Sequence, residues 1–207
     1  MKKLLFKISI VLATFMLSSS GFAQAYEEGK FIISAGYGFP NWGKTITKTS
    51  IVNSNATNVS ATGFGPIHFK AEYGFTDRFS LGLSINYVQY GFSWREANGS
   101  YGYNGGPQTY DYSFNSSGLA VNLRFNRHWE VNDKIDAYWG LGLGYGNTTY
   151  SFTSNDPGYN GANLKSIIPV SAEITLGMRY YFTENIGIYV EGGAAKSILQ
   201  GGIVAKF

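Results

Sequence analysis

Residues 135–146 read Ile-Asp-Ala-Tyr-Trp-Gly-Leu-Gly-Leu-Gly-Tyr-Gly, in which apolar or aromatic residues alternate with glycine, tyrosine or an acid. Successive side chains of a β-strand point to opposite faces, so this spacing places Ile135, Trp139 and Leu143 on one face. On a helix the same residues would not form one continuous apolar stripe. The stretch therefore predicts a β-strand with one apolar and one polar face.

Seven further stretches show the same alternation. They lie at 31–38, 67–74, 79–87, 118–125, 170–180, 186–191 and 199–207. The links at 74–78, 126–134 and 183–185 are short, and those at 40–62, 91–113 and 147–166 are long. Such an order is typical of an up-and-down barrel with short periplasmic turns and long outer loops, although the outer link at 195–197 is also short. We therefore expect eight antiparallel strands.

The distribution of charge decides which face of these strands meets lipid. The polar face carries eight charged residues, namely Lys70, Glu72, Arg124, Asp136, Glu173, Arg179, Glu191 and Lys206, whereas the apolar face carries none. A charge that faces lipid near the bilayer midplane costs roughly 2 to 4 kcal/mol. Aromatic residues gather at the strand ends, as in interfacial girdles. The pattern predicts an all-β fold, an eight-stranded antiparallel transmembrane β-barrel with a lipid-facing apolar exterior.

The eight charged residues would then face the lumen. Four acids meet four bases, and a barrel of eight strands has room inside only for side chains. Buried charges persist when they are paired, so we expect a salt-bridge network that fills a polar lumen. The strand positions place Lys70, Glu173 and Glu191 at mid-height and the other five near the periplasmic rim. Glycines on the same face leave room for these long side chains.

The first 25 residues have the features of a secretory signal peptide. A basic start is followed by an apolar stretch and by Ala23-Gln24-Ala25, so we expect cleavage after Ala25 and a single barrel domain at 26–207. All 13 acidic residues follow Ala25, whereas three of the 16 basic ones precede it, so the mature chain is neutral. This balance gives no reason to expect a nucleic-acid partner. The chain contains no cysteine and therefore no disulfide.

The signal sequence, the eight alternating stretches and the terminal segment Leu199–Phe207 resemble the small OmpA/OmpX-like outer-membrane barrels, which include opacity-type, porin-family proteins. The resemblance implies a location in the outer membrane of a Gram-negative bacterium, contact with lipid and lipopolysaccharide, and a monomer. It also implies that Phe207, Ala205 and Ile203 form the terminal signal that the outer-membrane assembly machinery reads. Since the sequence ends at Phe207, we expect no peptidoglycan-binding domain after the barrel.

The long outer links are the expected functional surface, because a rigid barrel can hold loops that bind a partner at the cell surface. Their aromatic residues are interspersed with Asn, Ser and Gly, a composition typical of binding loops. The candidate binding residues are Trp42, Trp94, Tyr101, Tyr103, Tyr110 and Tyr112. Tyr110 and Tyr112 alternate with polar residues, which indicates that the third and fourth strands extend beyond the membrane. We therefore expect a structural or adhesion-type role.

Two alternatives stay open. The barrel could be a narrow, porin-like ion channel, or it could be a lipid-modifying enzyme with His68 as its base. His68 is expected to face the lumen, whereas His128 falls in a predicted periplasmic turn. A hydrolytic pair formed by Glu173 and Glu191 is a weaker possibility, because nothing in their spacing requires it. We expect no catalytic residue, no cofactor and no metal site.

Overall fold

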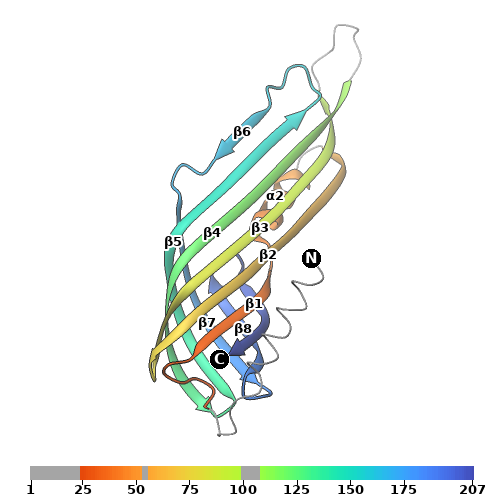
Figure 1. The fold of residues 1–207 in the computed structure, drawn as a ribbon. Coiled ribbons are helices and arrows are strands. Elements are labelled where there is room, and N and C mark those ends of the chain that lie inside the picture. Colours follow the sequence, from red (N-terminus) through yellow and green to blue (C-terminus); the bar gives the residue numbers. More distant parts are fainter. Residues whose placement is uncertain (1–23, 53–55, 99–107) are drawn as a thin grey trace, which may run out of the picture.

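The computed structural model describes residues 24–52, 56–98 and 108–207 (Figure 1). Its elements follow the chain in the order β1 (Phe31–Phe39), α2 (Trp42–Val52), β2 (Thr57–Thr76), β3 (Phe79–Asn98), β4 (Gln108–Asn132), β5 (Ile135–Ser154), β6 (Ala162–Lys165), β7 (Val170–Tyr181), β8 (Ile186–Ala194) and β9 (Leu199–Lys206). Within the described residues the fold is thus almost entirely β-structure.

The strands close into a barrel. Each strand pairs with its neighbours in an antiparallel way in the order β1-β2-β3-β4-β5-β7-β8-β9, and β9 pairs back onto β1. The closing register sets Ile33 opposite Ala205 and Ala35 opposite Ile203. Among the described strands, only β6 lies outside the ring, where it pairs with β5. The predicted eight-stranded up-and-down barrel is confirmed.

The wall of the barrel is much taller on one side than on the other (Figure 1). β1 and β9 have 9 and 8 residues, whereas β2, β3 and β5 have 20 each and β4 has 25. A tilted strand needs about 9 to 11 residues to cross a bilayer. The long strands therefore cross the membrane and continue as a protruding sheet, which we define as residues 88–98 of β3, 108–118 of β4 and 147–154 of β5.

This geometry corrects the predicted outer loops. Residues 57–62, 91–98, 108–113 and 147–154, expected in links, belong to paired strands, and 42–52 form α2. The predicted extension of the third and fourth strands is confirmed by the pairing of Asn98 with Gln108. At the other end, β4 continues to Asn132, and the side chain of Asn132 accepts hydrogen bonds from the backbone N–H groups of Lys134 and Ile135, at 2.9 and 3.0 Å.

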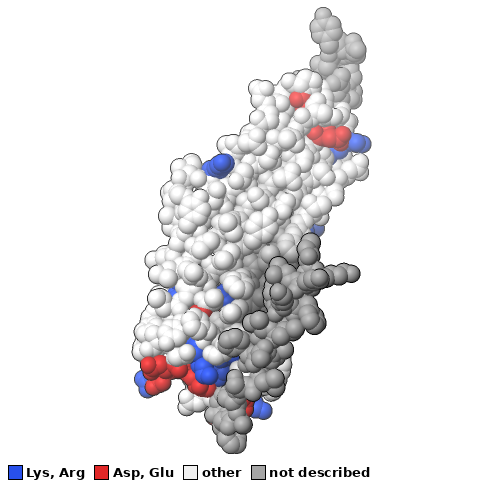
Figure 2. Space-filling model, viewed as in Figure 1, with Lys and Arg blue, Asp and Glu red and all other residues white. Residues whose placement is uncertain are grey.

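The barrel exterior is apolar. Leu143 is 68% exposed and Ile203 is 65% exposed, values that would be costly on a protein surrounded by water but suit contact with lipid chains. Figure 2 shows charged side chains gathered near the two ends of the visible face, with a broad, largely uncharged band between them. None of the helices in the described part of the chain has the length and apolar character needed to cross a membrane.

Candidate functional site

At mid-height in the lumen, Arg124 lies between two carboxylates. Its Nη1 is 3.2 Å from Oε1 of Glu173, and its Nη2 is 2.9 Å from Oε1 of Glu191. Lys70 approaches the other oxygen of Glu191 with its Nζ at 2.6 Å. The hydroxyl of Tyr138 donates to Glu191 at 2.6 Å as well. One guanidinium and one ammonium thus face two carboxylates.

A second group lies closer to the periplasmic end. Arg179 pairs with Glu72 and, through Nη1 at 2.9 Å, with Asp136. The guanidinium carbon of Arg179 also lies 4.2 Å from the ring centroid of Tyr138, whose hydroxyl reaches the mid-height group. Tyr138 therefore links the two layers of the network. Both arginines are 2% exposed, so the attraction acts with little solvent screening.

Lys206 stands apart from these two groups. Its Nζ lies 3.4 Å from Oε1 of Glu27 and donates to the backbone carbonyl of Gln24. It also lies over the ring of Tyr181, at 5.3 Å from the centroid. Seven of the eight predicted lumen charges thus lie in two ion-pair groups, and the eighth fixes the N-terminal segment to β9. Arg124, expected near the periplasmic rim, pairs instead with the mid-height acids.

His68 takes part in an arrangement that resembles a hydrolase triad. Its Nε2 lies 3.1 Å from Oγ of Ser197, and its Nδ1 lies 2.5 Å from Oδ1 of Asn86. All three residues are at most 2% exposed. A Cβ at position 38 would collide with both the Ser197 hydroxyl and the His68 ring, so Gly38 packs tightly against the pair. The geometry allows proton transfer, but burial keeps all three side chains away from solvent.

His128 corrects another expectation. It belongs to β4 rather than to a periplasmic turn, and its side chain is 1% exposed inside the barrel. Nδ1 lies 3.0 Å from the carboxylate of Asp136, and Nε2 lies 2.9 Å from Oγ of Ser80. The ring is therefore an interior, hydrogen-bonded part of the lower lumen.

Above the membrane the polarity of the two faces of the long strands is reversed: the outer face becomes polar and the inner face apolar. On the outer face, the paired residues Tyr87 and Leu119 are followed by Gln89 and Ser117. On the inner face the change is opposite. The buried polar residues Asn86 and Asn122 give way to a cluster of Val88, Tyr90, Phe92 and Phe114. A strand that leaves lipid for water must turn its apolar side chains inward. The switch thus marks the outer edge of the membrane.

Beyond this cluster the inner face carries an aromatic stack. Trp94 and Tyr112, paired across β3 and β4, stack with ring centroids 5.7 Å apart and planes inclined by 16°. Tyr159 meets Tyr112 nearly at a right angle, at 5.8 Å. The hydroxyl of Tyr112 donates to Asp156 at 2.9 Å. Burial and this hydrogen bond raise the pKa of Tyr112 to about 12.

The candidate loop residues are thus only partly brought together. Trp94 and Tyr112 stack, and Tyr110 lies further along the inner face, opposite Glu96. Trp42 lies at the start of α2, on another element. Tyr101 and Tyr103 fall outside the described residues. The sequence prediction does not include Glu96, and it names Tyr159 only as one of the aromatic residues of the outer links, not as a candidate binding residue. Glu96 shares the inward face with Trp94 by simple alternation, but no local signal places Tyr159 against Tyr112.

The terminal residues close the barrel seam. Phe207 and Phe31 exchange two backbone hydrogen bonds, at 2.8 and 3.1 Å. Ile203 and Ala205 pair with β1 and with β8, and Ile203 faces outward. No group of three potential metal-binding His, Asp or Glu side chains occurs among residues 24–52, 56–98 and 108–207.

Comparisons with solved structures find other outer-membrane barrels. The N-terminal β-barrel domain of Pseudomonas aeruginosa OprF is 15% identical, with coverage of 87% of this chain and 98% of that one and a TM-score of 0.43. OprG from the same organism is 14% identical, with coverage of 89% and 99% and a TM-score of 0.45. The attachment invasion locus protein Ail of Yersinia pestis is 16% identical, with coverage of 87% and 99% and a TM-score of 0.39.

No curated protein matches the sequence. The model of the outer membrane protein β-barrel domain, however, matches residues 9–201. Since this match spans nearly the whole chain of 207 residues, the protein belongs to the family of outer membrane protein β-barrel domains.

Proposed function

We propose that this barrel is a non-conducting surface-binding protein, which presents the inner face of its protruding sheet to a partner outside the cell. The observation that carries this proposal is that, above the membrane, the apolar side chains of the long strands lie on the inner face of the sheet and the polar ones on the outer face. Phe92 and Phe114 are 2% and 5% exposed and support the sheet, whereas Trp94 and Tyr112 beyond them are only half-buried. A supported aromatic face held away from the lipid is typical of a recognition surface.

The lumen network supports the non-conducting part of the proposal. Arg124 reaches from β4 to Glu173 on β7 and Glu191 on β8, and so crosses the interior at mid-height. An ion on its way through would have to break these contacts, because an eight-stranded barrel has little interior volume beyond its side chains. The porin-like alternative requires this network to open.

The remaining partners follow from the location. The outward apolar side chains contact outer-membrane lipid and lipopolysaccharide, and Phe207, directly after β9, is read by the assembly machinery. Export removes the signal peptide after Ala25, and the mature barrel acts as a monomer. None of these steps requires nucleic acid or an enzymatic activity.

A truncation tests the proposal. Ser93 and Ser113 are directly paired, so residues 94–112 can be replaced by an Asn-Gly turn without a change of register. We expect cells that carry the truncated barrel to lose adherence to cultured epithelial cells. Ser117→Ala, on the outer face and paired with Gln89, is the control and should adhere like the wild type. Equal adherence of truncated and wild-type cells would refute a role of this sheet in binding.

A second measurement addresses the channel alternative. The purified wild-type protein is placed in planar bilayers, and the current is recorded at fixed voltage. We expect no steady conductance. A steady conductance that changes with Arg124→Gln would show that the lumen conducts, and the non-conducting part of the proposal would be wrong.

A further inference from the structure

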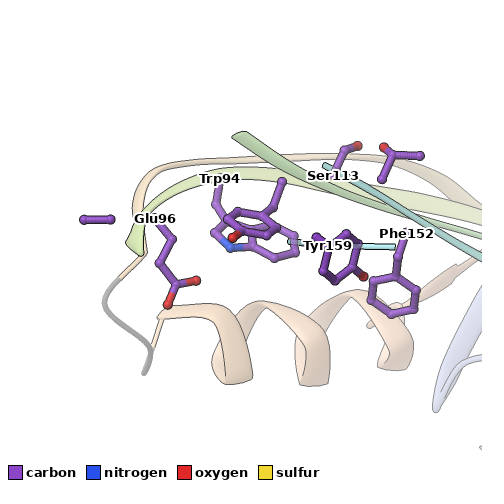
Figure 3. A pocket seen from close by; sticks show the side chains of 8 residues that line it. Trp94, Glu96, Ser113, Phe152 and Tyr159 are labelled. Atoms are coloured by element: carbon purple, nitrogen blue, oxygen red, sulfur yellow. The ribbon is translucent and has the colours of Figure 1, made fainter. Parts of the chain in front are cut away.

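The inner face of the protruding sheet contains a cavity of about 310 Å³, which we call the Trp94 pocket. It is lined by Trp94, Glu96, Ala97, Tyr112, Ser113, Phe152, Thr153 and Tyr159. In Figure 3, Trp94, Glu96 and Phe152 project from the strands toward the side on which α2 lies, and Tyr159, from the link between β5 and β6, lies on the same side. The volume is at the lower end of the range of small-molecule sites.

The walls of the pocket are ring faces and ring edges. Trp94 and Tyr112 are nearly parallel, and Tyr159 is inclined by 85° to Tyr112, so aromatic surfaces bound the cavity in two directions. Each ring carries negative electrostatic potential on its face. A cation within about 6 Å of a ring centroid is attracted by this potential, most strongly by tryptophan. The geometry therefore favours a positively charged group over an anion.

Among the described residues, Glu96 is the one charged side chain that lines the pocket. No ion pair to Glu96 is formed within the described chain, and residues 53–55 and 99–107 contain no Lys or Arg that could supply one. Arg95, the adjacent base, pairs with Asp111 at 2.8 Å on the other face of the sheet. The pocket thus combines aromatic walls with a carboxylate that forms no ion pair with any described residue.

The polar side chains of the lining fit a sugar less well. Ser113 lies on the opposite side of the strands from Trp94 in Figure 3, and its partner Thr153 shares that outer face by alternation. A saccharide needs several donors and acceptors directed into the site, whereas here the carboxylate of Glu96 and the tyrosine hydroxyls provide the polar contacts. A bulky cation with few hydrogen-bonding groups suits such walls better.

We propose that the Trp94 pocket binds a trimethylammonium group, as carried by choline or by a choline lipid headgroup. The methyl groups pack against Trp94 and Tyr112, and the positive charge is balanced by Glu96. This inference rests on the proposed surface-binding function, since it names the chemistry that the same aromatic face recognises. The cavity would hold the headgroup while the rest of the partner stays outside.

Choline itself is the probe. The purified barrel is kept in a polyoxyethylene detergent, which contains neither sugar nor ammonium groups, and binding is followed by saturation transfer to the methyl protons of choline. The neutral isostere 3,3-dimethylbutan-1-ol and methyl glucoside are measured in parallel. We expect choline to bind about tenfold more tightly than the isostere, because the isostere has the same shape but no charge.

Variants assign the effect to the pocket. Glu96→Gln and Trp94→Ala should each weaken choline binding about tenfold. Arg95→Gln, one residue away on the opposite face, is the matched control and should bind like the wild type. Heat-modifiable mobility on gels shows whether each variant is folded, and Glu96→Gln keeps the test decisive if Trp94→Ala does not fold. Vesicles of phosphatidylcholine, compared with phosphatidylglycerol, then show whether the headgroup of a lipid is accepted.

Equal binding of choline and its isostere, tighter binding of methyl glucoside, or unchanged binding by Glu96→Gln would overturn the proposal. These results would leave the adhesion measurement with the truncated barrel untouched. If choline fails to bind and truncation still abolishes adherence, only the trimethylammonium site is refuted. If truncation has no effect on adherence, the surface-binding function itself fails.

Discussion

Tyr26 stacks on His128, with ring centroids 3.8 Å apart and planes inclined by only 5°. The hydroxyl of Tyr26 donates to the backbone carbonyl of Phe79 at 2.6 Å and also lies 3.0 Å from the carbonyl oxygen of Thr76. His128 in turn bonds Asp136 in the lower lumen group. The N-terminal segment is therefore packed into the periplasmic end of the barrel, where it covers the charged network from below.

Removal of this contact should lower the stability of the barrel. Tyr26→Phe keeps the stack but loses the hydroxyl, so we expect a loss of about 1 kcal/mol in the free energy of unfolding. Tyr26→Ala also loses the packed ring, which should cost about 3 kcal/mol. Urea unfolding in lipid vesicles, followed by tryptophan fluorescence, measures both values. Glu28→Gln, at an exposed neighbouring position, serves as the control. If Tyr26→Ala unfolds at the same urea concentration as the control, the segment does not stabilise the barrel.

The same segment contains the predicted cleavage site. Cleavage after Ala25 would make Tyr26 the first residue and would remove the Gln24 carbonyl that Lys206 contacts, while Glu27 would stay within reach of Lys206. We expect N-terminal sequencing of the protein isolated from membranes to begin at Tyr26. A mature protein that begins before Ala23 would show that the signal is processed elsewhere.

Arg124 and Glu191 allow the energetics of the lumen to be measured. Removal of one partner breaks a buried ion pair, which costs up to roughly 3–5 kcal/mol, although Glu191 keeps its contact with Lys70 and Arg124 keeps its contact with Glu173. Arg124→Met and Glu191→Gln should each destabilise the barrel by this amount in urea unfolding. The double variant should be more stable than the sum of the two losses predicts, by roughly 0.5–3 kcal/mol. Additive losses would mean that the pair at 2.9 Å contributes no coupling energy, and Arg95→Gln provides the exposed control.

Within the membrane the sequence predicts most of this architecture, because side chains that face lipid must be apolar. Leu141 and Leu143 must face outward, and Glu173 and Arg124 must face inward, so the alternation alone assigns each face. The partners of the charges are harder to predict, because they depend on the depth of each strand in the barrel. Lys206 illustrates this: its face was predicted correctly, but its partner Glu27 lies in a segment without any alternation.

Above the membrane the outer face meets water, so its side chains need not be apolar. Gln89 and Ser117 continue the two-residue period of their strands, but they are polar at positions on the outer face where the lower part of each strand has apolar residues. When the strand is defined by apolar residues on the lipid-facing side, this change from apolar to polar residues looks like its end. The lipid-facing pattern therefore predicts a link at residues 91–98. His128 was misplaced for a related reason, since it follows Phe125, the last residue of the lipid-type pattern.

Ser197 and His68 offer a last test, which separates a structural hydrogen bond from catalysis. Their 3.1 Å contact has the geometry of a nucleophile and its base, yet Gly38 packs against both groups and all three residues are buried. We therefore expect no labelling of Ser197 by a fluorophosphonate in the folded barrel, and Ser197→Ala should lose about 1 kcal/mol of stability through the missing hydrogen bond. Mass spectrometry of the labelled peptide checks the first point, with the Ser197→Ala variant as background. A fluorophosphonate adduct on Ser197 of the native protein would instead make the serine a reactive nucleophile and restore the enzyme alternative, because an unactivated buried hydroxyl does not react in this way.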